Sequence, residues 1–122
     1  MGKLVVAEAS TGYKFVLKAN NGQTIASSDI YASVHSCLGG VESVKKNAVI
    51  AKLDDCTEAG SSKTTNPKFE VYHGASGEYR FRLRARNGEI LAVSERYASK
   101  PSCLKGIASL QKNAPEAQVV KA

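Results

Sequence analysis

Four arginines alternate with apolar residues in the segment YRFRLRAR, residues 79–86. Successive residues of a β-strand point to opposite faces of the sheet, so the four guanidinium groups would line one face over about 20 Å. Guanidinium groups at this spacing could follow a phosphate backbone, and each contact would add a salt-dependent contribution to the affinity. The segment therefore makes Arg80, Arg82, Arg84 and Arg86 candidates for binding nucleic acid or another polyanion.

A solvated sheet face would show the same alternation, because the uncovered side of a strand must carry polar side chains. Residues 13–20 present Lys14, Val16, Lys18 and Asn20 in the same phase, so Lys14 and Lys18 join the candidate set. Aromatic side chains that would stack on bases are not clearly interleaved with the arginines, since the rings of that strand point the other way. A polyanion site and a solvated surface both stay open, and the solvated surface already explains the alternation.

The sequence predicts no catalytic, cofactor-binding or metal-binding residue. Cys37 and Cys103 fall at matched positions on an apolar helix face, which predicts buried small side chains rather than a reactive pair. Cys56 lies in a polar segment, where it is an oxidation liability before it is a nucleophile. His35 and His73 have no partner at a recognisable motif spacing, and the chain contains no GxGxxG, P-loop or HExxH motif. We therefore expect no enzyme activity and no cofactor.

The charge permits anionic partners without choosing among them. The formal net charge is +6 at pH 7, and it is uneven along the chain. Residues 1–53 carry six bases against three acids, residues 54–67 one base against three acids, and residues 68–122 ten bases against five acids. No apolar run is long enough to span a bilayer, and no secretory signal is evident at the N-terminus. We expect a cytoplasmic protein that does not bind a membrane.

Two copies of one pattern make up most of the chain and must position these residues. The segment from Phe15, FVLKANNGQTIASSDIYASVHSCLGGVESVKKNA, aligns without a gap on the segment from Phe81, FRLRARNGEILAVSERYASKPSCLKGIASLQKNA, at a constant shift of 66 residues. The same shift carries the alignment back to Val5 and Val71. The segment DDCTEAGSSKTTNP between the copies has the composition of a linker. We predict repeat 1 at residues 1–53, a linker at 54–67 and repeat 2 at 68–122, folded around one shared core.

Each repeat is predicted to contain three strands, a helix and a fourth strand. The strands are expected at residues 4–8, 13–19, 24–28 and 49–53 of repeat 1, and at 69–73, 79–86, 90–94 and 117–120 of repeat 2. An Asn-Gly pair follows the second strand of each repeat and predicts a tight turn with positive φ at both central residues. Between the third and fourth strands the apolar period changes from two to about 3.6, with Ser33 and Ser99 as helix caps. Gly40 and Gly106 inside the helices predict a close approach of each helix to the sheet.

One repeat of about fifty residues buries too little apolar surface to be securely stable. The two repeats are therefore predicted to form a single α+β domain, with one antiparallel sheet and both helices on the same face. Phe15, Leu17, Phe81 and Leu83 are expected to lie buried beneath the helices. The residues expected to cover them are Leu38, Val41, Leu104 and Ile107.

Three motifs occur in both repeats: F-x-L-x-A-x-N-G, Y-A-S-x-x-S-C-L-x-G and S-x-x-K-N-A. Together they resemble the YegP-like family of small bacterial tandem-repeat proteins, a domain of unknown function, and the resemblance covers nearly the whole chain. It implies a β(3)-α-β unit used twice, with the C-terminal strands exchanged between the units. It implies no activity and no catalytic residue.

These observations predict a small binding or interaction module of unknown ligand. It is expected to be a monomer with internal twofold pseudo-symmetry, because the duplication already supplies the second repeat. Two alternatives remain open. One is nucleic-acid or polyanion binding through the basic sheet face, and the other is a small-molecule or enzyme role in the groove between the repeats.

Overall fold

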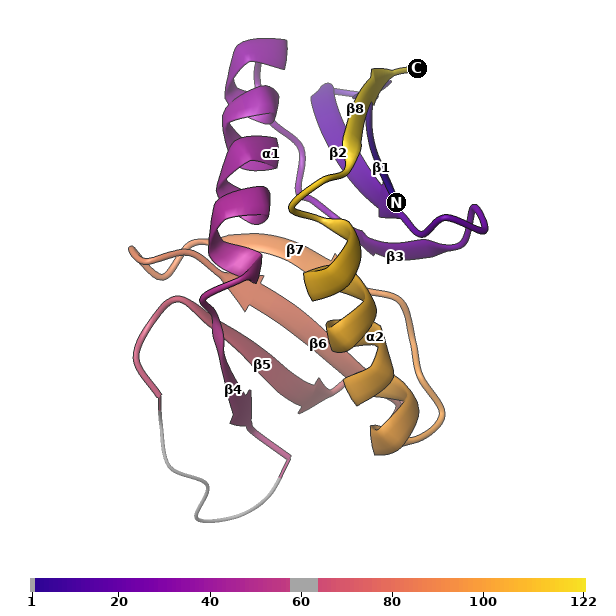
Figure 1. Cartoon of the computed structure of the whole chain (residues 1–122), viewed down its shortest axis with the longest axis vertical. Coiled ribbons are helices and arrows are strands. Elements are labelled where there is room, and N and C mark those ends of the chain that lie inside the picture. Colours follow the sequence, from indigo (N-terminus) through magenta and orange to yellow (C-terminus); the bar gives the residue numbers. More distant parts are fainter. Residues whose placement is uncertain (1, 58–63) are drawn as a thin grey trace.

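The structure is a computed structural model that describes residues 2–57 and 64–122. The part of the predicted linker that includes Gly60, Ser61 and Ser62 lies outside the described residues. Within them the fold is α+β, with eight strands in a single sheet and two helices (Figure 1). No helix in these two ranges is long and apolar enough to cross a membrane.

The order of elements in each repeat is the predicted one. The elements of repeat 1 are β1 (Lys3–Ala9), β2 (Gly12–Lys18), β3 (Thr24–Ser27), α1 (Val34–Ala48) and β4 (Lys52–Asp55). Those of repeat 2 are β5 (Lys68–His73), β6 (Tyr79–Arg84), β7 (Ile90–Ser94), α2 (Lys100–Asn113) and β8 (Gln118–Lys121). Strand β4 starts later than predicted and extends to Asp55, into the segment predicted as linker.

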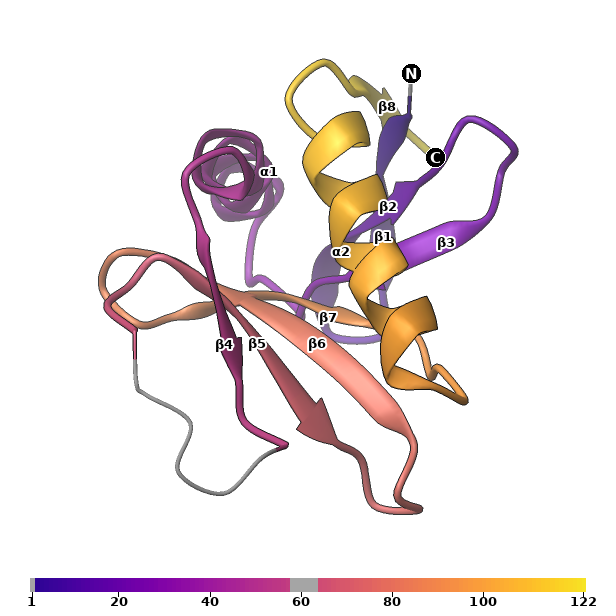
Figure 2. The same ribbon diagram turned by 60° about the horizontal axis from the view of Figure 1, so that its bottom comes forward.

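The sheet is mixed, so the prediction of a wholly antiparallel sheet is wrong. Its strand order is β4-β5-β6-β7-β3-β2-β1-β8, and the antiparallel pair β3 and β7 joins the two halves. The last strand of each repeat pairs with the first strand of the other repeat, β4 with β5 and β8 with β1, and both pairs are parallel. Figure 2 shows each exchanged strand lying beside its partner. Residues 56–67 separate β4 from β5, and most of the chain separates β1 from β8, so neither pair is joined by the short hairpin that antiparallel neighbours can use.

The two first hairpins differ in length by one residue. Val6 lies opposite Phe15, whereas Val71 lies opposite Phe81. The shift between the repeats is therefore 81 − 15 = 66 on the second strand but 71 − 6 = 65 on the first. The extra residue is in the β5–β6 turn, where Gly77 has a φ of 80° and Gly74 N–H donates to Glu78 O. Neighbouring residues of a strand point to opposite faces, so an alignment that ignores the extra residue places each side chain of the first strand on the wrong face. The structural equivalent of Val5 is therefore Glu70 and not Val71.

The Asn-Gly turns also differ from the prediction. Only the glycines have positive φ, 86° at Gly22 and 87° at Gly88, and no other residue type in the described ranges does. Ala19 N–H donates to Gln23 O, which closes a three-residue loop of the type that needs one left-handed residue instead of two. The Asn21 side chain accepts a hydrogen bond from Gln23 N–H at 2.9 Å and holds the turn without a strained backbone.

The core combines alternate strand residues with one stripe of each helix. Phe15, Leu17, Phe81 and Leu83 are buried as predicted. The helix residues that are buried with them, apart from the glycines, are Cys37, Val41, Val44, Asn47, Ala48, Cys103, Ile107 and Leu110. Helix α1 packs on β1, β2 and β7, and α2 packs on β6 and β3, so each helix contacts both repeats.

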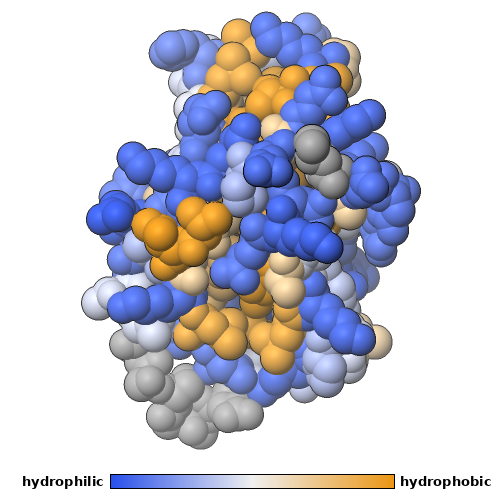
Figure 3. Space-filling view, viewed as in Figure 1, coloured by the Kyte–Doolittle hydropathy of each residue, from blue (hydrophilic) through white to orange (hydrophobic). Residues whose placement is uncertain are grey.

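The prediction for Leu104 is wrong, because that side chain is 38% exposed. Cys103, Ile107 and Leu110 follow each other at intervals of four and three residues and form the buried stripe of α2. Leu104 lies beside this stripe, and Leu38 of α1 is only half-buried. On the side seen in Figure 3 the exposed hydrophobic atoms form several separate patches between hydrophilic ones.

A tyrosine ring lies directly against each helix at the buried glycine. A Cβ on Gly40 would lie 2.7 Å from Cζ of Tyr31 and 3.1 Å from Phe15, and a Cβ on Gly106 would lie 2.7 Å from Cζ of Tyr97. The predicted close approach at the helix glycines is confirmed, although the partner is a tyrosine ring and not the sheet backbone. The ring of Tyr31 stacks on Phe15 at a centroid distance of 6.2 Å.

Replacing Gly106 or Gly40 with alanine should destabilise the protein. Alanine favours a helix by up to about 1 kcal/mol over glycine, but the added methyl must displace a packed tyrosine, which typically costs about 1–3 kcal/mol. Gly39→Ala is a matched control, because a Cβ at this neighbouring helix position has nothing within 4 Å. Thermal melts should show a lower Tm for Gly40→Ala and Gly106→Ala and an unchanged or higher Tm for Gly39→Ala. A rise in Tm for all three variants would contradict the tyrosine contact.

Candidate binding surface

Three of the four candidate arginines lie on one face of β6. Arg80, Arg82 and Arg84 alternate with the buried Phe81 and Leu83 and point away from the core. Arg86 lies beyond the end of the strand, in the β6–β7 turn, and is exposed. The predicted run of four is therefore three, because the hairpin from Ala85 to Glu89 ends the alternation.

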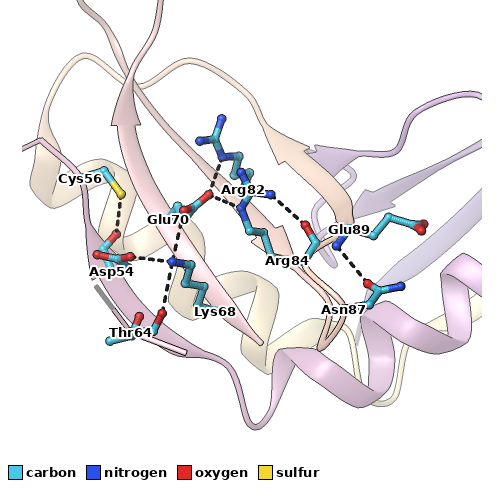
Figure 4. Close-up of polar contacts among 10 residues, drawn as sticks. Asp54, Cys56, Thr64, Lys68, Glu70, Arg82, Arg84, Asn87 and Glu89 are labelled. Carbon is cyan, nitrogen blue, oxygen red and sulfur yellow. Dashed lines mark hydrogen bonds and ion pairs between the residues drawn. The ribbon is translucent and has the colours of Figure 1, made fainter. Parts of the chain in front are cut away.

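The arginines of β6 are already paired with carboxylates. Glu70 of β5 lies directly opposite Arg82. Its Oε1 is 2.7 Å from Nε of Arg82 and 2.5 Å from Nε of Arg84 (Figure 4). Arg80 Nε lies 3.2 Å from Oε2 of Glu78. A phosphate group would have to compete with these internal carboxylates.

The ion pairs continue from β6 to the exchanged strand β4. Lys68 Nζ lies 2.9 Å from Oδ2 of Asp54 and 3.4 Å from Oε2 of Glu70, and the side chain of Asp54 is only 3% exposed (Figure 4). On the next residue of β4, Asp55 pairs with Lys100 of α2 at 2.9 Å. We call Asp54, Lys68, Glu70, Arg82 and Arg84 the ionic network. It attaches the last strand of repeat 1 to the sheet of repeat 2.

The ionic network determines the protonation of Glu70. Burial disfavours the charged carboxylate and would raise the pKa of Glu70, but hydrogen bonds from Arg82 and Arg84, together with their charges, outweigh this effect. The pKa of Glu70 is consequently lowered to about 2. Hydrogen bonds from Thr57 and Lys100 likewise lower the pKa of Asp55 to about 2. Both carboxylates are charged at neutral pH.

Asp54, Cys56 and Glu70 resemble a set of metal ligands, since their ligand-type atoms lie within 4.8 Å of one another. The ammonium group of Lys68, however, contacts both carboxylates and already supplies the positive charge. The Cys56 Sγ contacts Asp54 O at 3.8 Å, and burial together with Asp54 raises the pKa of its thiol. We assign this cluster to strand attachment.

The other two cysteines are buried, as their positions on the helix stripe predicted. Neither Cys37 nor Cys103 is in a disulfide. Burial raises the pKa of both thiols, that of Cys103 to about 11. Protonated thiols in an apolar core are poor nucleophiles. Their surroundings therefore favour packing over chemistry.

The half of the sheet that contains β1, β2 and the exchanged strand β8 carries apolar residues on this face, where the other half has the ionic network. Strand pairing matches Val5 with Glu70, Val16 with Arg82 and Val120 with Asp54. Val5 of β1 lies directly beside Val16 of β2 and Val120 of β8. We call these three half-buried residues the valine patch.

Three lysines, Lys3, Lys14 and Lys18, lie around the valine patch on the same face. Lys3 and Lys18 match Lys68 and Arg84 of repeat 2, and Lys14 matches Arg80. In the ranges that the structure describes, none of Lys3, Lys14 and Lys18 forms an ion pair with a carboxylate. Lys3 lies directly opposite Lys18 in the sheet, and like charges in such a pair destabilise it. On this face, Lys3, Lys14 and Lys18 are therefore cations without a carboxylate partner among the described residues, unlike the arginines of β6.

A groove between the repeats does exist. It has a volume of about 590 Å³ and runs between the β2–β3 turn and α2. Its lining consists of Ala19, Asn20, Asn21, Lys105, Ala108, Ser109, Lys112 and Asn113. The lining residues offer hydrogen-bond donors but no carboxylate, thiol or imidazole for acid–base or nucleophilic chemistry.

Inspection of the sequence missed Glu70, Asp54 and Lys3. The signal for Glu70 was present in the segment KFEVYH, because pairing residues 68–73 against 79–84 around the turn places Glu70 opposite Arg82. The constant shift of 66 hid this pairing by matching Val5 with Val71. No local signal indicated Asp54, since it joins the site only through the exchange of β4.

Lowering the pH should weaken folding through Glu70. Its pKa falls from an ordinary value of 4.5 to about 2 in the folded protein, so its stabilisation is complete above about pH 5 and is lost as the pH falls toward 2. The effect is on the order of 3 kcal/mol in the free energy of unfolding. In urea melts from pH 7 to pH 2, Glu70→Gln should be destabilised at pH 7 and lose less stability than the wild type on acidification.

Glu42→Gln is the control for this measurement, because Glu42 is exposed on α1 and has no ion pair with a described residue. It should follow the wild-type pH profile. Parallel profiles for Glu70→Gln and the wild type would show that Glu70 is not held by the arginines.

Comparison with known proteins agrees with the fold and the repeat. The family model described as "Domain of unknown function (DUF1508)" matches residues 9–55 and again residues 75–120. A UPF0339 protein of Stutzerimonas stutzeri is 39% identical over 109 residues, which cover 89% of this chain and 85% of that protein. A UPF0339 protein of Methanosarcina acetivorans is 58% identical over 53 residues, which cover 43% of this chain but 91% of that protein.

Among solved structures, the solution structure of YegP from Escherichia coli, a protein of unknown function, matches with a TM-score of 0.80. The match is 30% identical in sequence and covers 98% of this chain and 91% of that chain. The two family matches, the identities and the shared fold lead to one conclusion: the chain belongs to the DUF1508 (UPF0339) family, as a YegP-like protein with two copies of the domain.

Proposed function

We propose that the chain is a binding module that recognises anionic partners through the part of its sheet that surrounds the valine patch. In this proposal both helices cover the face that carries Phe15 and Phe81, and the opposite face is open to partners. The protein acts as a monomer and has no catalytic activity. Among the described residues, the candidate groove and the cysteines supply no acid–base or nucleophilic pair that would favour an enzyme.

The observation that supports the proposal is the difference in charge compensation between the repeats. Of the four candidate arginines, Arg80, Arg82 and Arg84 each contact a carboxylate of their own repeat, and Arg86 lies in the turn beyond the strand. Lys14 and Lys18 were the weaker candidates, yet with Lys3 they form no ion pair in the described ranges. An anion that approaches these lysines would relieve the repulsion between Lys3 and Lys18.

Lysine side chains also suit a module that binds reversibly. Each ammonium group is a hydrated point charge on a flexible chain, so it can contact an anionic group without a fixed geometry. Lys14 and Lys18 are four residues apart on β2, which spans about 13 Å at ordinary strand rise. The face can thus contact more than one charge of an extended partner.

Changing Lys3, Lys14 and Lys18 to glutamine should weaken anion binding without loss of stability. NMR titrations with a heparin fragment, a short single-stranded DNA and an acidic peptide would measure both affinity and location. The expected result is chemical-shift change in β1, β2 and β8, with affinities reduced about tenfold or more in the triple variant, since each lost contact removes a salt-dependent contribution. The Tm should stay within a few degrees or rise, because the variant removes a like-charge pair.

A second triple variant, Lys46, Lys105 and Lys112 to glutamine, is the matched control. It makes the same change in net charge on exposed helix residues, and two of its positions line the groove between the repeats. It should bind within about twofold of the wild type if location matters more than net charge. Equal losses in both variants, or no wild-type binding to any probe at about 150 mM salt, would overturn the proposal, and a larger loss in the control would favour the groove.

A further inference from the structure

We infer that the partner is an acidic polypeptide segment with aliphatic side chains, docked on the valine patch and held by the lysines around it. This inference rests on the proposed function and specifies its partner. Its starting point is that strand pairing gives each residue of the valine patch an equivalent residue in the ionic network. In the ionic network each cation contacts a carboxylate of the chain, whereas Lys3 and Lys18 beside the valine patch have no such contact in the described ranges.

Two of the three cations of the ionic network have a counterpart beside the valine patch, but neither of its carboxylates does. Lys3 and Lys18 occupy the places of Lys68 and Arg84, which pair with Asp54 of β4 and Glu70 of β5. At the places of these two carboxylates, the half of the sheet with β1, β2 and β8 has Val120 and Val5. This half of the sheet therefore keeps two of the positive charges and lacks both negative ones. A partner with carboxylates would provide the negative charges that Asp54 and Glu70 provide in the ionic network.

The valine patch gives the partner its second property. Val5, Val16 and Val120 come from three adjacent strands and lie side by side on the face opposite Leu4 and Phe15. They are half-buried, so each side chain still has apolar surface that a partner can remove from water. Aliphatic side chains between the carboxylates of the partner would cover this surface. Charge complementarity and the apolar centre together describe an acidic, amphipathic segment.

Nucleic acid fits this surface less well. Bases bind open sheet faces by stacking on aromatic rings. None of the residues of β1, β2 and β8 on this face is aromatic: they are Lys3, Val5, Ala7, Ala9, Gly12, Lys14, Val16, Lys18, Gln118 and Val120. On the corresponding part of repeat 2, Tyr72 is already covered by the Arg82 guanidinium, 4.4 Å from its ring centroid.

The decisive variant introduces the side chains of the ionic network at the equivalent positions of the valine patch. Val5→Glu, Val16→Arg and Val120→Asp would place Glu70, Arg82 and Asp54 equivalents beside Lys3 and Lys18, which already match Lys68 and Arg84. The substitution should fold, because repeat 2 carries the same side chains at the same pairing positions. It should remove the apolar centre and give Lys3 and Lys18 carboxylate partners, as Lys68 and Arg84 have.

Fluorescence anisotropy with two labelled peptides would test the inference. One peptide of about twelve residues, long enough to cross the patch in extended form, alternates glutamate with valine, and the other alternates glutamate with serine. The wild type should bind the Glu/Val peptide about tenfold more tightly than the Glu/Ser peptide, because only the first buries the valine patch. The triple variant should lose about tenfold or more in affinity for the Glu/Val peptide.

Val5→Thr with Val16→Thr is a milder variant that keeps every lysine and should fold even if the triple variant does not. It should bind both peptides equally, and its affinity for short single-stranded DNA should match that of the wild type. If the wild type binds DNA and both peptides through the lysines without preferring valine, the inferred partner is wrong while the proposed function stands. If no anionic probe binds at all, both fail.

Discussion

Neither repeat completes its own part of the sheet, and the rest of the structure depends on this exchange. Strand β4 leaves repeat 1 to pair with β5, and β8 leaves repeat 2 to pair with β1. Each helix precedes an exchanged strand and packs on strands of both repeats. A unit of about fifty residues alone would bury too little apolar surface for secure stability, so exchange and shared helices build one core from two small units.

Periodicity predicted the elements well because it reports burial, but it does not report strand direction. Ser33 and Ser99 cap the helices as predicted, each accepting a hydrogen bond from the N–H three residues on. The parallel pairs β4–β5 and β8–β1 could not be read from alternation, which is the same for either direction, and their exchange came only from the family resemblance. Leu104 shows a related limit, since an apolar residue beside a helix stripe need not be buried.

The face of the sheet on which the candidate residues lie was predicted correctly, but the ion pairs of the arginines were not predicted. Alternation placed Arg82 and Lys18 opposite the core, and the structure agrees. Whether a charge is compensated depends on the strand beside it, and a single extra residue in the β5–β6 turn moved Glu70 onto the arginine face. Repeats aligned by sequence identity alone conceal such a change, because the alignment is set by the longer, better matched segments.

Covalent linkage of the two units has a consequence for how the surface can diversify. In an assembly of two identical units, every substitution would appear twice, so an ionic cluster and an apolar cluster could not occupy equivalent places. In a tandem chain the two copies can change independently. One half of the sheet can therefore keep the ion pairs that attach its exchanged strand, while the other half carries different side chains at the same positions. The strand pairing places Val5, Val16 and Val120 where the other half of the sheet has Glu70, Arg82 and Asp54, so in this chain the two halves differ in chemistry on the same face.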